Sequence, residues 1–191
     1  MAGRPRDPEL EKRLLDAAWS LLTSRGYDAL TMAKVAAQAQ AHRTDLYRRW
    51  PTKAQLVVDV LAGHLPPVSD HDTGSLRGDL KAIVDDFAES WSSSWVDGLM
   101  ALTADLHTDP DAELAFRTMA EGRGRPLHHA LTRATRRGEI GEIDELGLVG
   151  DLIEGPLMHR RMIGRQPLTP EYLDAVVTAA HRLLTGMSVP S

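Results

Sequence analysis

Apolar residues recur every three to four positions through most of the chain, and polar residues fill the positions between them. In the first such stretch the apolar positions are Leu10, Leu14, Ala17, Ala18, Leu21 and Leu22. This spacing places the apolar side chains on one face of an α-helix. We predict a helix over about residues 9–25. It should end at Gly26, because glycine readily adopts the left-handed conformation that stops a helix.

Three shorter helical patterns follow before residue 65. Thr31 is a candidate N-cap for the first of them. The second should cover about residues 43–49 and end before Pro51, and Thr52 is the N-cap candidate for the third. Two short helices separated by three or four residues are the sequence signature of a helix-turn-helix.

A polar segment rich in turn-forming residues runs from Pro66 to Gly74, which indicates a loop or linker. Helical spacing resumes beyond it, and we expect helices over about residues 76–94, 99–108, 110–137, 145–163 and 170–185. No segment alternates with period two, so no sheet is expected. The chain is therefore predicted to be all-α and to consist of two parts that meet near residue 65.

The composition narrows the possible classes of protein. With 191 residues, of which 42% are hydrophobic, one or two domains with a sizeable core are expected. The absence of cysteine excludes disulfides, thiolate zinc sites and cysteine nucleophiles. No apolar run approaches the ~20 residues that span a bilayer, and no signal-peptide pattern is present. We expect a cytoplasmic protein without a cofactor or metal.

The formal net charge of −5, taken as one number, argues against a nucleic-acid partner. It hides a division, since residues 1–65 carry ten basic and seven acidic side chains (+3), and the remainder carries twelve and twenty (−8). Four bases fall close together around the third predicted helix: Arg43, Arg48, Arg49 and Lys53. One interpretation is a solvated basic helix face. The other is DNA binding, because this is the helix of a helix-turn-helix that enters the major groove.

The segment over residues 13–56 resembles the N-terminal domain of TetR/AcrR-family transcriptional repressors. The matching positions are Leu14, Ala17, Ala18, Leu22, Gly26, Tyr27, Thr31, Val35, Ala36 and Ala39, followed by Leu46, Tyr47, Trp50 and Lys53 in the family's L-Y-x-x-F-x-x-K signature. Further along, RRGEI (136–140) and GPLMHRRM (155–162) resemble pieces of a ligand-binding domain found in actinobacterial members.

This resemblance implies a homodimer that binds a pseudo-palindromic operator in double-stranded DNA and is released by a small-molecule effector. Carried over by matching position, the DNA-binding residues would be Arg4, Arg6, Thr31, His42, Arg43, Thr44, Tyr47, Arg48 and Lys53. The three residues 42–44 would face base edges, and Thr31, Tyr47 and Lys53 would hold phosphates. The two arginines of the N-terminal arm would reach the minor groove. Trp50 is expected in the core.

One position departs from the family. The turn between the two short helices usually contains glycine, and this chain has Gln40 there. A residue other than glycine in the left-handed region costs on the order of 1 kcal/mol. Either Gln40 carries this cost or the turn has a different shape.

The second part offers candidates for an effector pocket and for a dimer interface. The predicted ligand-binding residues are Phe87, Trp91, Trp95, Met100, Thr103, His107, Phe116, Met119 and His128, and the first three of these are placed on one helix at a spacing of four. Aromatic and methionine side chains favour an apolar or aromatic effector. The predicted interface residues are Leu152, Leu157, Val176, Val177, Ala180 and Leu184. For each set, plain core packing within the protomer is the alternative.

No nucleophile–base pair or phosphate-binding glycine loop is visible, and the Asp-His-Asp-Thr string at residues 70–73, which is similar to an aspartyl-phosphatase motif, follows a proline-rich loop instead of a buried strand. We predict a regulator with a three-helix DNA-binding domain in residues 1–65 and a ligand-binding and dimerisation domain in residues 66–191. The alternatives are a helical small-molecule-binding enzyme with a vestigial helix-turn-helix, and a ligand sensor whose output is a protein partner.

Overall fold

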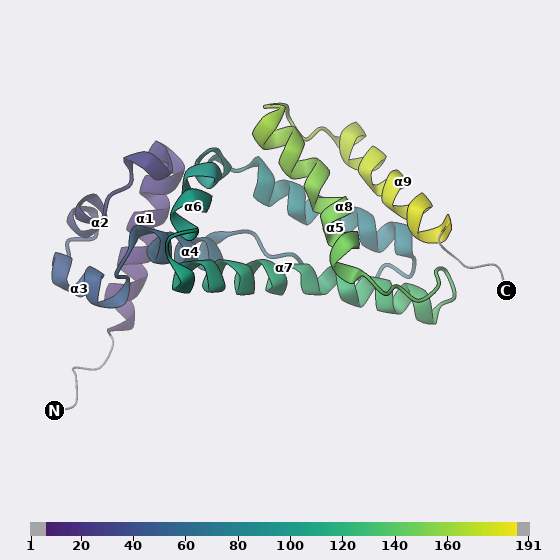
Figure 1. Ribbon diagram of the computed structural model, residues 1–191, viewed down its shortest axis with the longest axis horizontal. Helices are drawn as coiled ribbons and strands as arrows, with labels where there is room; N and C mark the ends of the chain where they lie inside the picture. Colours follow the sequence, from purple (N-terminus) through teal and green to yellow (C-terminus); the bar gives the residue numbers. More distant parts are fainter. Residues whose placement is uncertain (1–6, 187–191) are drawn as a thin grey trace. The chain divides into compact units, whose positions relative to one another are not determined.

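The structure is a computed structural model that describes residues 7–186 (Figure 1). Every regular element among these residues is helical, which confirms the predicted all-α class. The elements are α1 (Pro8–Ala29), α2 (Met32–Gln38), α3 (Arg43–Arg49), α4 (Lys53–His64), α5 (Leu76–Ser92), η1 (Ser94–Gly98), α6 (Leu99–Leu106), α7 (Pro110–Arg136), α8 (Leu146–Met158), η2 (His159–Ile163) and α9 (Pro170–Gly186). No helix in the described part is long and apolar enough to cross a membrane.

The predicted helix starts and stops of the N-terminal part are confirmed. Gly26 has φ +79° and interrupts α1, which then adds one short turn that ends at Ala29. Thr31 caps α2, since its hydroxyl accepts a hydrogen bond from the Lys34 amide at 3.3 Å. Thr52 caps α4 in the same way through the Gln55 amide at 3.2 Å.

One predicted helix is shorter than expected. We predicted a helix to about residue 94 with Trp91 and Trp95 on the same face, whereas α5 ends at Ser92 and Trp95 lies in the separate 3₁₀ segment η1. Ser93 is extended, with φ −72° and ψ 151°. Serine side chains compete for backbone hydrogen bonds and so weaken helix ends, and three consecutive serines (92–94) mark this break.

The chain divides into two compact units that are discontinuous in sequence. The first unit contains residues up to 65 together with residues 94–119, and the second unit contains residues 66–93 and those from 120 onward. The first unit therefore consists of α1–α4, η1, α6 and the beginning of α7. The division into functional domains at residue 65 stays a prediction.

The core of the first unit lies between α1, α4 and the returning segment η1–α6 (Figure 1). Trp50 is buried there, as predicted, and its indole Nε1 donates to Asp59 at 2.7 Å. Gly98 lies directly against Tyr27, where a Cβ atom would come within 2.5 Å of the tyrosine Cβ. Any side chain at position 98 would therefore displace Tyr27.

The second unit is built on α5, which packs against α8 and α9. At its start, the loop over residues 66–75 is fixed by charged side chains. Asp79 is fully buried and accepts hydrogen bonds from the amide and the hydroxyl of Thr73, both at 2.7 Å. The guanidinium groups of Arg133 and Arg137 lie 3.7 and 3.6 Å from its second oxygen. Arg133 also donates to Asp70 at 2.8 Å, so the Asp-His-Asp-Thr string at residues 70–73 belongs to this cluster of ion pairs around Asp79.

Candidate nucleic-acid interface and effector elements

The turn between α2 and α3 keeps a regular helix-ending geometry. Gln40 itself adopts the left-handed conformation, with φ +52°. The amide of Ala41 donates to the carbonyl of Ala36 at 2.9 Å, and the amide of Gln40 donates to the carbonyl of Ala37 at 3.1 Å. This pair of hydrogen bonds is a Schellman motif. Gln40 therefore bears the steric cost of a backbone conformation that favours glycine, and the usual turn forms although no glycine is present at this position.

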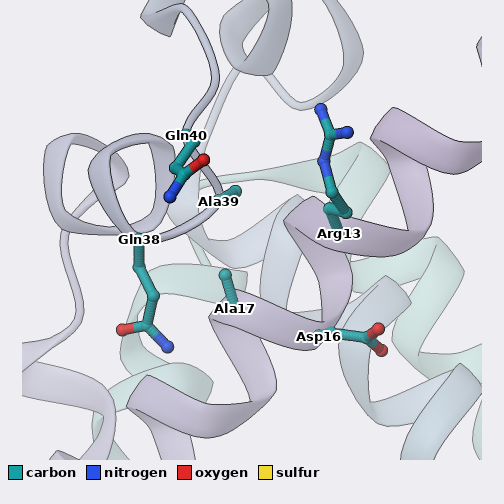
Figure 2. A pocket seen from close by; sticks show the side chains of 6 residues that line it. All are labelled: Arg13, Asp16, Ala17, Gln38, Ala39 and Gln40. Carbon is teal, nitrogen blue, oxygen red and sulfur yellow. The ribbon is translucent and has the colours of Figure 1, made fainter.

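Two small residues let this turn approach α1. Ala17 on α1 and Ala39 before the turn are both buried. Figure 2 shows the turn beside α1. A depression of about 340 Å³ lies where the two meet. Its lining residues are Arg13, Asp16, Ala17, Gln38, Ala39 and Gln40. Helix α2 packs against α1, and α3 packs against α2.

Helix α3 presents a polar face to solvent and an apolar face to the core. Leu46 is fully buried, and Trp50 follows it at the end of the helix. On α3 and at its N-cap, the exposed residues of the predicted DNA-binding set are His42, Arg43, Thr44, Tyr47 and Arg48. Tyr47 is half exposed, with no burial that would make it a core residue. Local folding therefore brings five predicted contact residues to one accessible helix.

The two neighbouring arginines of α3 have different surroundings. Arg48 is exposed and pairs with Asp45 at 2.9 Å. The side chain of Arg49 is almost completely buried, donates to the carbonyl of Asp45 at 3.1 Å, and lies 3.7 Å from Glu11 of α1. Arg49 is thus a structural residue, whereas the side chain of Arg48 is accessible to an external partner.

The first turn of α4 contacts the turn between α6 and α7. Lys53 lies over the ring of Tyr27, with its Nζ 3.7 Å from the ring centroid and 3.8 Å from Asp105. Thr52 donates to Asp109 at 2.5 Å. Lys53 was predicted from the sequence as a site residue, but its contacts with Tyr27 and Asp105 were not, because no periodic spacing relates residues so far apart in the chain.

The remaining predicted DNA-binding residues lie at two other places. Thr31 is exposed at the N-terminus of α2, where its hydroxyl already caps the helix. Arg4 and Arg6 lie outside the described residues.

The predicted effector residues are divided between the two units. Those in the second unit are Phe87, Trp91 and His128, and those in the first unit are Trp95, Met100, Thr103, His107, Phe116 and Met119. Phe87, Trp91 and Trp95 are buried. Met100, Thr103 and His107 are exposed on α6, and the other three are half-buried.

A polar group lies beside the aromatic residues of the second unit. The indole Nε1 of Trp91 donates to Glu154 of α8 at 2.9 Å. Burial raises the pKa of Glu154, although the bond from Trp91 and the nearby Arg123 oppose that shift. Arg123 in turn donates to Ser90 at 2.5 Å and to the carbonyl of Pro66 at 2.7 Å.

Most of the predicted interface residues are buried within the protomer. Leu157, Val176, Val177, Ala180 and Leu184 have little or no exposed surface, and they pack inside the second unit. Leu152 is exposed. The other large apolar side chains that α8 and α9 leave exposed are Leu148, Met158 and Leu183.

A helix-turn-helix seated on a third helix, with cationic and hydroxyl side chains exposed on its second helix, defines a class of DNA-binding protein. Comparison with known families agrees with this class. Residues 14–60 match the model of bacterial regulatory proteins of the tetR family, and residues 70–180 match the model of the tetracyclin repressor-like C-terminal domain.

Individual relatives cover nearly the whole chain. An HTH-type transcriptional regulator of Mycobacterium tuberculosis is 30% identical over 183 residues, which is 93% of this chain and 90% of the relative. The DNA-binding transcriptional repressor TetR of Mycobacteroides abscessus is 33% identical over 169 residues, 86% of this chain and 87% of that protein. The crystal structure of the TetR family transcription regulator SCO0332 has a TM-score of 0.71 at 27% identity and covers 95% of this chain and 100% of that one.

The chain belongs to the TetR family of transcriptional regulators. The resemblance inferred from residues 13–56 is confirmed, and it extends to the second half of the chain. The relatives and the fold are those of regulators, and no enzyme family is indicated.

Proposed function

We propose that this regulator represses transcription by binding, as a homodimer, a pseudo-palindromic operator through α3. The observation that carries the proposal is the accessible face of α3, where Arg43 and Thr44 stand at the start of the helix and Tyr47 one turn further on. Arginine reads guanine edges in the major groove, and hydroxyl groups bind bases or phosphates. The Mycobacteroides relative is a transcriptional repressor, which supports repression as the direction of regulation.

Thr31, Arg48 and Lys53 are proposed as phosphate contacts, and the predicted roles of Arg4 and Arg6 in the minor groove belong to the same proposal. The dimer would form through α8 and α9. Their exposed leucines, which include Leu148 and Leu152, are the apolar side chains that a second copy would cover.

A small molecule would release the operator. The aromatic residues Phe87 and Trp91 of the second unit support an apolar or aromatic effector, and Glu154 beside Trp91 adds one polar group. The effector must bind the DNA-free arrangement more tightly than the DNA-bound one, and a coupling of ~1–3 kcal/mol is the usual scale.

The test is a mobility-shift and footprinting experiment with the DNA upstream of the regulator's own gene. We expect a protected site with two-fold symmetry that is bound by a dimer in sedimentation. Tyr47→Phe should weaken binding, because it removes one hydroxyl contact to DNA. Unchanged affinity in that variant contradicts the contact assignment, a monomer at micromolar concentration contradicts the dimer, and no binding at low salt contradicts DNA binding itself.

A further inference from the structure

The segment that returns to the first unit is strongly acidic. Residues 94–119 contain five acidic and one basic side chain, and they belong to the same compact unit as the helix-turn-helix. Two of these acids, Asp105 and Asp109, lie at the turn between α6 and α7 and contact the beginning of α4. An acidic turn therefore meets the helix end that is proposed to hold a DNA phosphate.

The carboxylate of Asp105 forms an ion pair with the ammonium group of Lys53. The Oδ2 atom of Asp105 lies 3.8 Å from Lys53 Nζ, and the same oxygen accepts a 2.5 Å hydrogen bond from the hydroxyl of Tyr27. The ring of Tyr27 covers the ammonium from another side, at 3.7 Å from its centroid. The Lys53 side chain is 26% exposed and that of Asp105 is 49% exposed. The cation is thus partly covered, and its nearest anion comes from its own chain.

Asp109 fastens this turn to α4. Its carboxylate accepts from the Thr52 hydroxyl at 2.5 Å and from the Gln55 amide group at 3.0 Å. The Thr52 hydroxyl is the largest cause that holds the pKa of Asp109 below its usual value. Asp109 also caps α7 by accepting from the Ala112 amide at 3.1 Å. One carboxylate therefore ties the starts of α4 and α7 together and keeps Asp105 in reach of Lys53.

We propose that Asp105 is an internal substitute for an operator phosphate at Lys53, so that the α6–α7 turn and DNA compete for the same cation. A carboxylate and a phosphate oxygen carry the same sign of charge and accept the same ammonium hydrogen bonds. A carboxylate and a phosphate that were both close to one lysine would repel each other. Contact of Lys53 with DNA therefore requires the Lys53–Asp105 ion pair to open, and the paired arrangement is the DNA-free one. This inference rests on the proposed function.

Asp105→Asn tests the competition with little change in shape. The asparagine oxygen still accepts from Tyr27, but the negative charge beside Lys53 is lost. Since partly exposed ion pairs contribute modestly, we expect DNA binding to become up to about fivefold tighter per protomer. The measurement is fluorescence anisotropy with the footprinted operator duplex and with a random duplex of the same length. Both should show the gain, because a phosphate contact is independent of sequence.

The matched control is Asp111→Asn, which removes an equal charge from the same acidic segment at an exposed residue. It should change affinity less than Asp105→Asn does. In a Lys53→Ala background the gain from Asp105→Asn should disappear. A gain that persists there, or equal gains in the two aspartate variants, reduces the effect to general charge and overturns the proposal. Weaker binding by Asp105→Asn overturns it as well, because Asp105 would then position Lys53 for DNA.

These outcomes differ from failure of the proposed function, in which no variant and no unmodified protein binds either duplex at low salt. A readout without DNA is the rate of amine labelling at Lys53, followed by mass spectrometry. We expect Lys53 to react faster in Asp105→Asn than in the unmodified protein, whereas Lys12, which pairs with Asp16 at 3.3 Å, should react at the same rate in both. Equal rates at Lys53 in the two proteins would contradict its pairing with Asp105.

Discussion

Helix α3 of the first unit and the loop at the start of the second unit use arginine side chains in different ways. In the first unit, α3 leaves Arg43 and Arg48 exposed at the surface, although Arg49 beside them is buried. In the second unit, Asp79 has no exposed surface, and Arg133 and Arg137 converge on it from α7 and its end. The arginines of α3 are therefore accessible to an external partner, whereas those of the second unit are engaged in internal ion pairs.

The difference has a physical cause. An exposed arginine keeps its hydration and remains free to release counterions when it meets a phosphate. A buried carboxylate has lost its hydration, so it must be paired with charges or hydrogen-bond donors. The net charge of a segment thus says little by itself, because only the exposed share of the charge is available to DNA.

The largest effect should come from breaking the internal cluster. Asp79→Ala removes the anion on which two arginines and the Thr73 turn depend. Removing one partner from a buried ionic group typically costs about 3–5 kcal/mol, so the midpoint of urea unfolding should fall strongly. Asp72→Ala is the control, since Asp72 contacts the same arginines from an exposed position. It should cost less than about 1 kcal/mol, and similar losses in both variants would contradict the role of burial.

The next largest effect should come from removing an exposed arginine of α3 in the first unit. Arg43→Ala should weaken operator binding by about 1–3 kcal/mol, or roughly 5- to 150-fold, as expected for a lost base contact. Its unfolding free energy should change by less than about 0.5 kcal/mol, because the side chain is exposed. Arg25→Ala, a neutralised exposed site at the end of α1, is the control for charge alone. If both variants bind DNA equally, Arg43 makes no specific contact.

The third prediction concerns the backbone of the helix-turn-helix. Gln40→Gly should stabilise the protein by up to about 1 kcal/mol, because glycine adopts φ near +52° without the steric cost that glutamine has. Ala37→Gly inside α2 should have the opposite sign, since glycine weakens a helix interior by a similar amount. Urea unfolding of the two variants measures both effects. Destabilisation by Gln40→Gly would show that the glutamine side chain contributes contacts that outweigh its backbone cost.

The smallest effect should be a dependence on pH in the second unit. Because the pKa of Glu154 is raised in the folded protein, the unfolded chain releases this proton first as pH rises. Its contribution to stability is therefore complete below the ordinary glutamate pKa and is lost as pH rises through the folded value. Glu154→Gln should remove this loss and raise the melting temperature at neutral pH, with little change in acid. Glu89→Gln, exposed on α5, should do neither.

Much of this fold could be predicted from sequence because the relevant signals are local. Thr31 and Thr52 cap helices through amides three residues away, and Gly26 ends the main body of α1 by its own backbone conformation. The exposed residues of α3 also follow from local periodicity. The resemblance to the family adds the prediction that these positions bind DNA.

What escaped the sequence depends on contacts between distant residues. The pairing of Lys53 with Asp105 and the burial of Arg49 against Glu11 join segments that no periodic pattern connects. The apolar stripe of α9 predicted which residues make contacts. Spacing alone does not show whether the contacting helix belongs to the same chain or to a second copy. Val177, predicted at the dimer interface, is fully buried within the protomer.

The discontinuity of the first unit has a consequence for synthesis on the ribosome. Helices α1 and α4 pack against η1 and α6, which belong to a segment that ends at residue 119. At ~5–20 residues per second, the four N-terminal helices leave the ribosome several seconds before this segment follows. During that interval Tyr27 and its neighbours are uncovered. In a nascent chain with only residues up to 65 outside the ribosome, the surface around Tyr27 should therefore bind chaperones, and it should be covered once residue 119 has emerged.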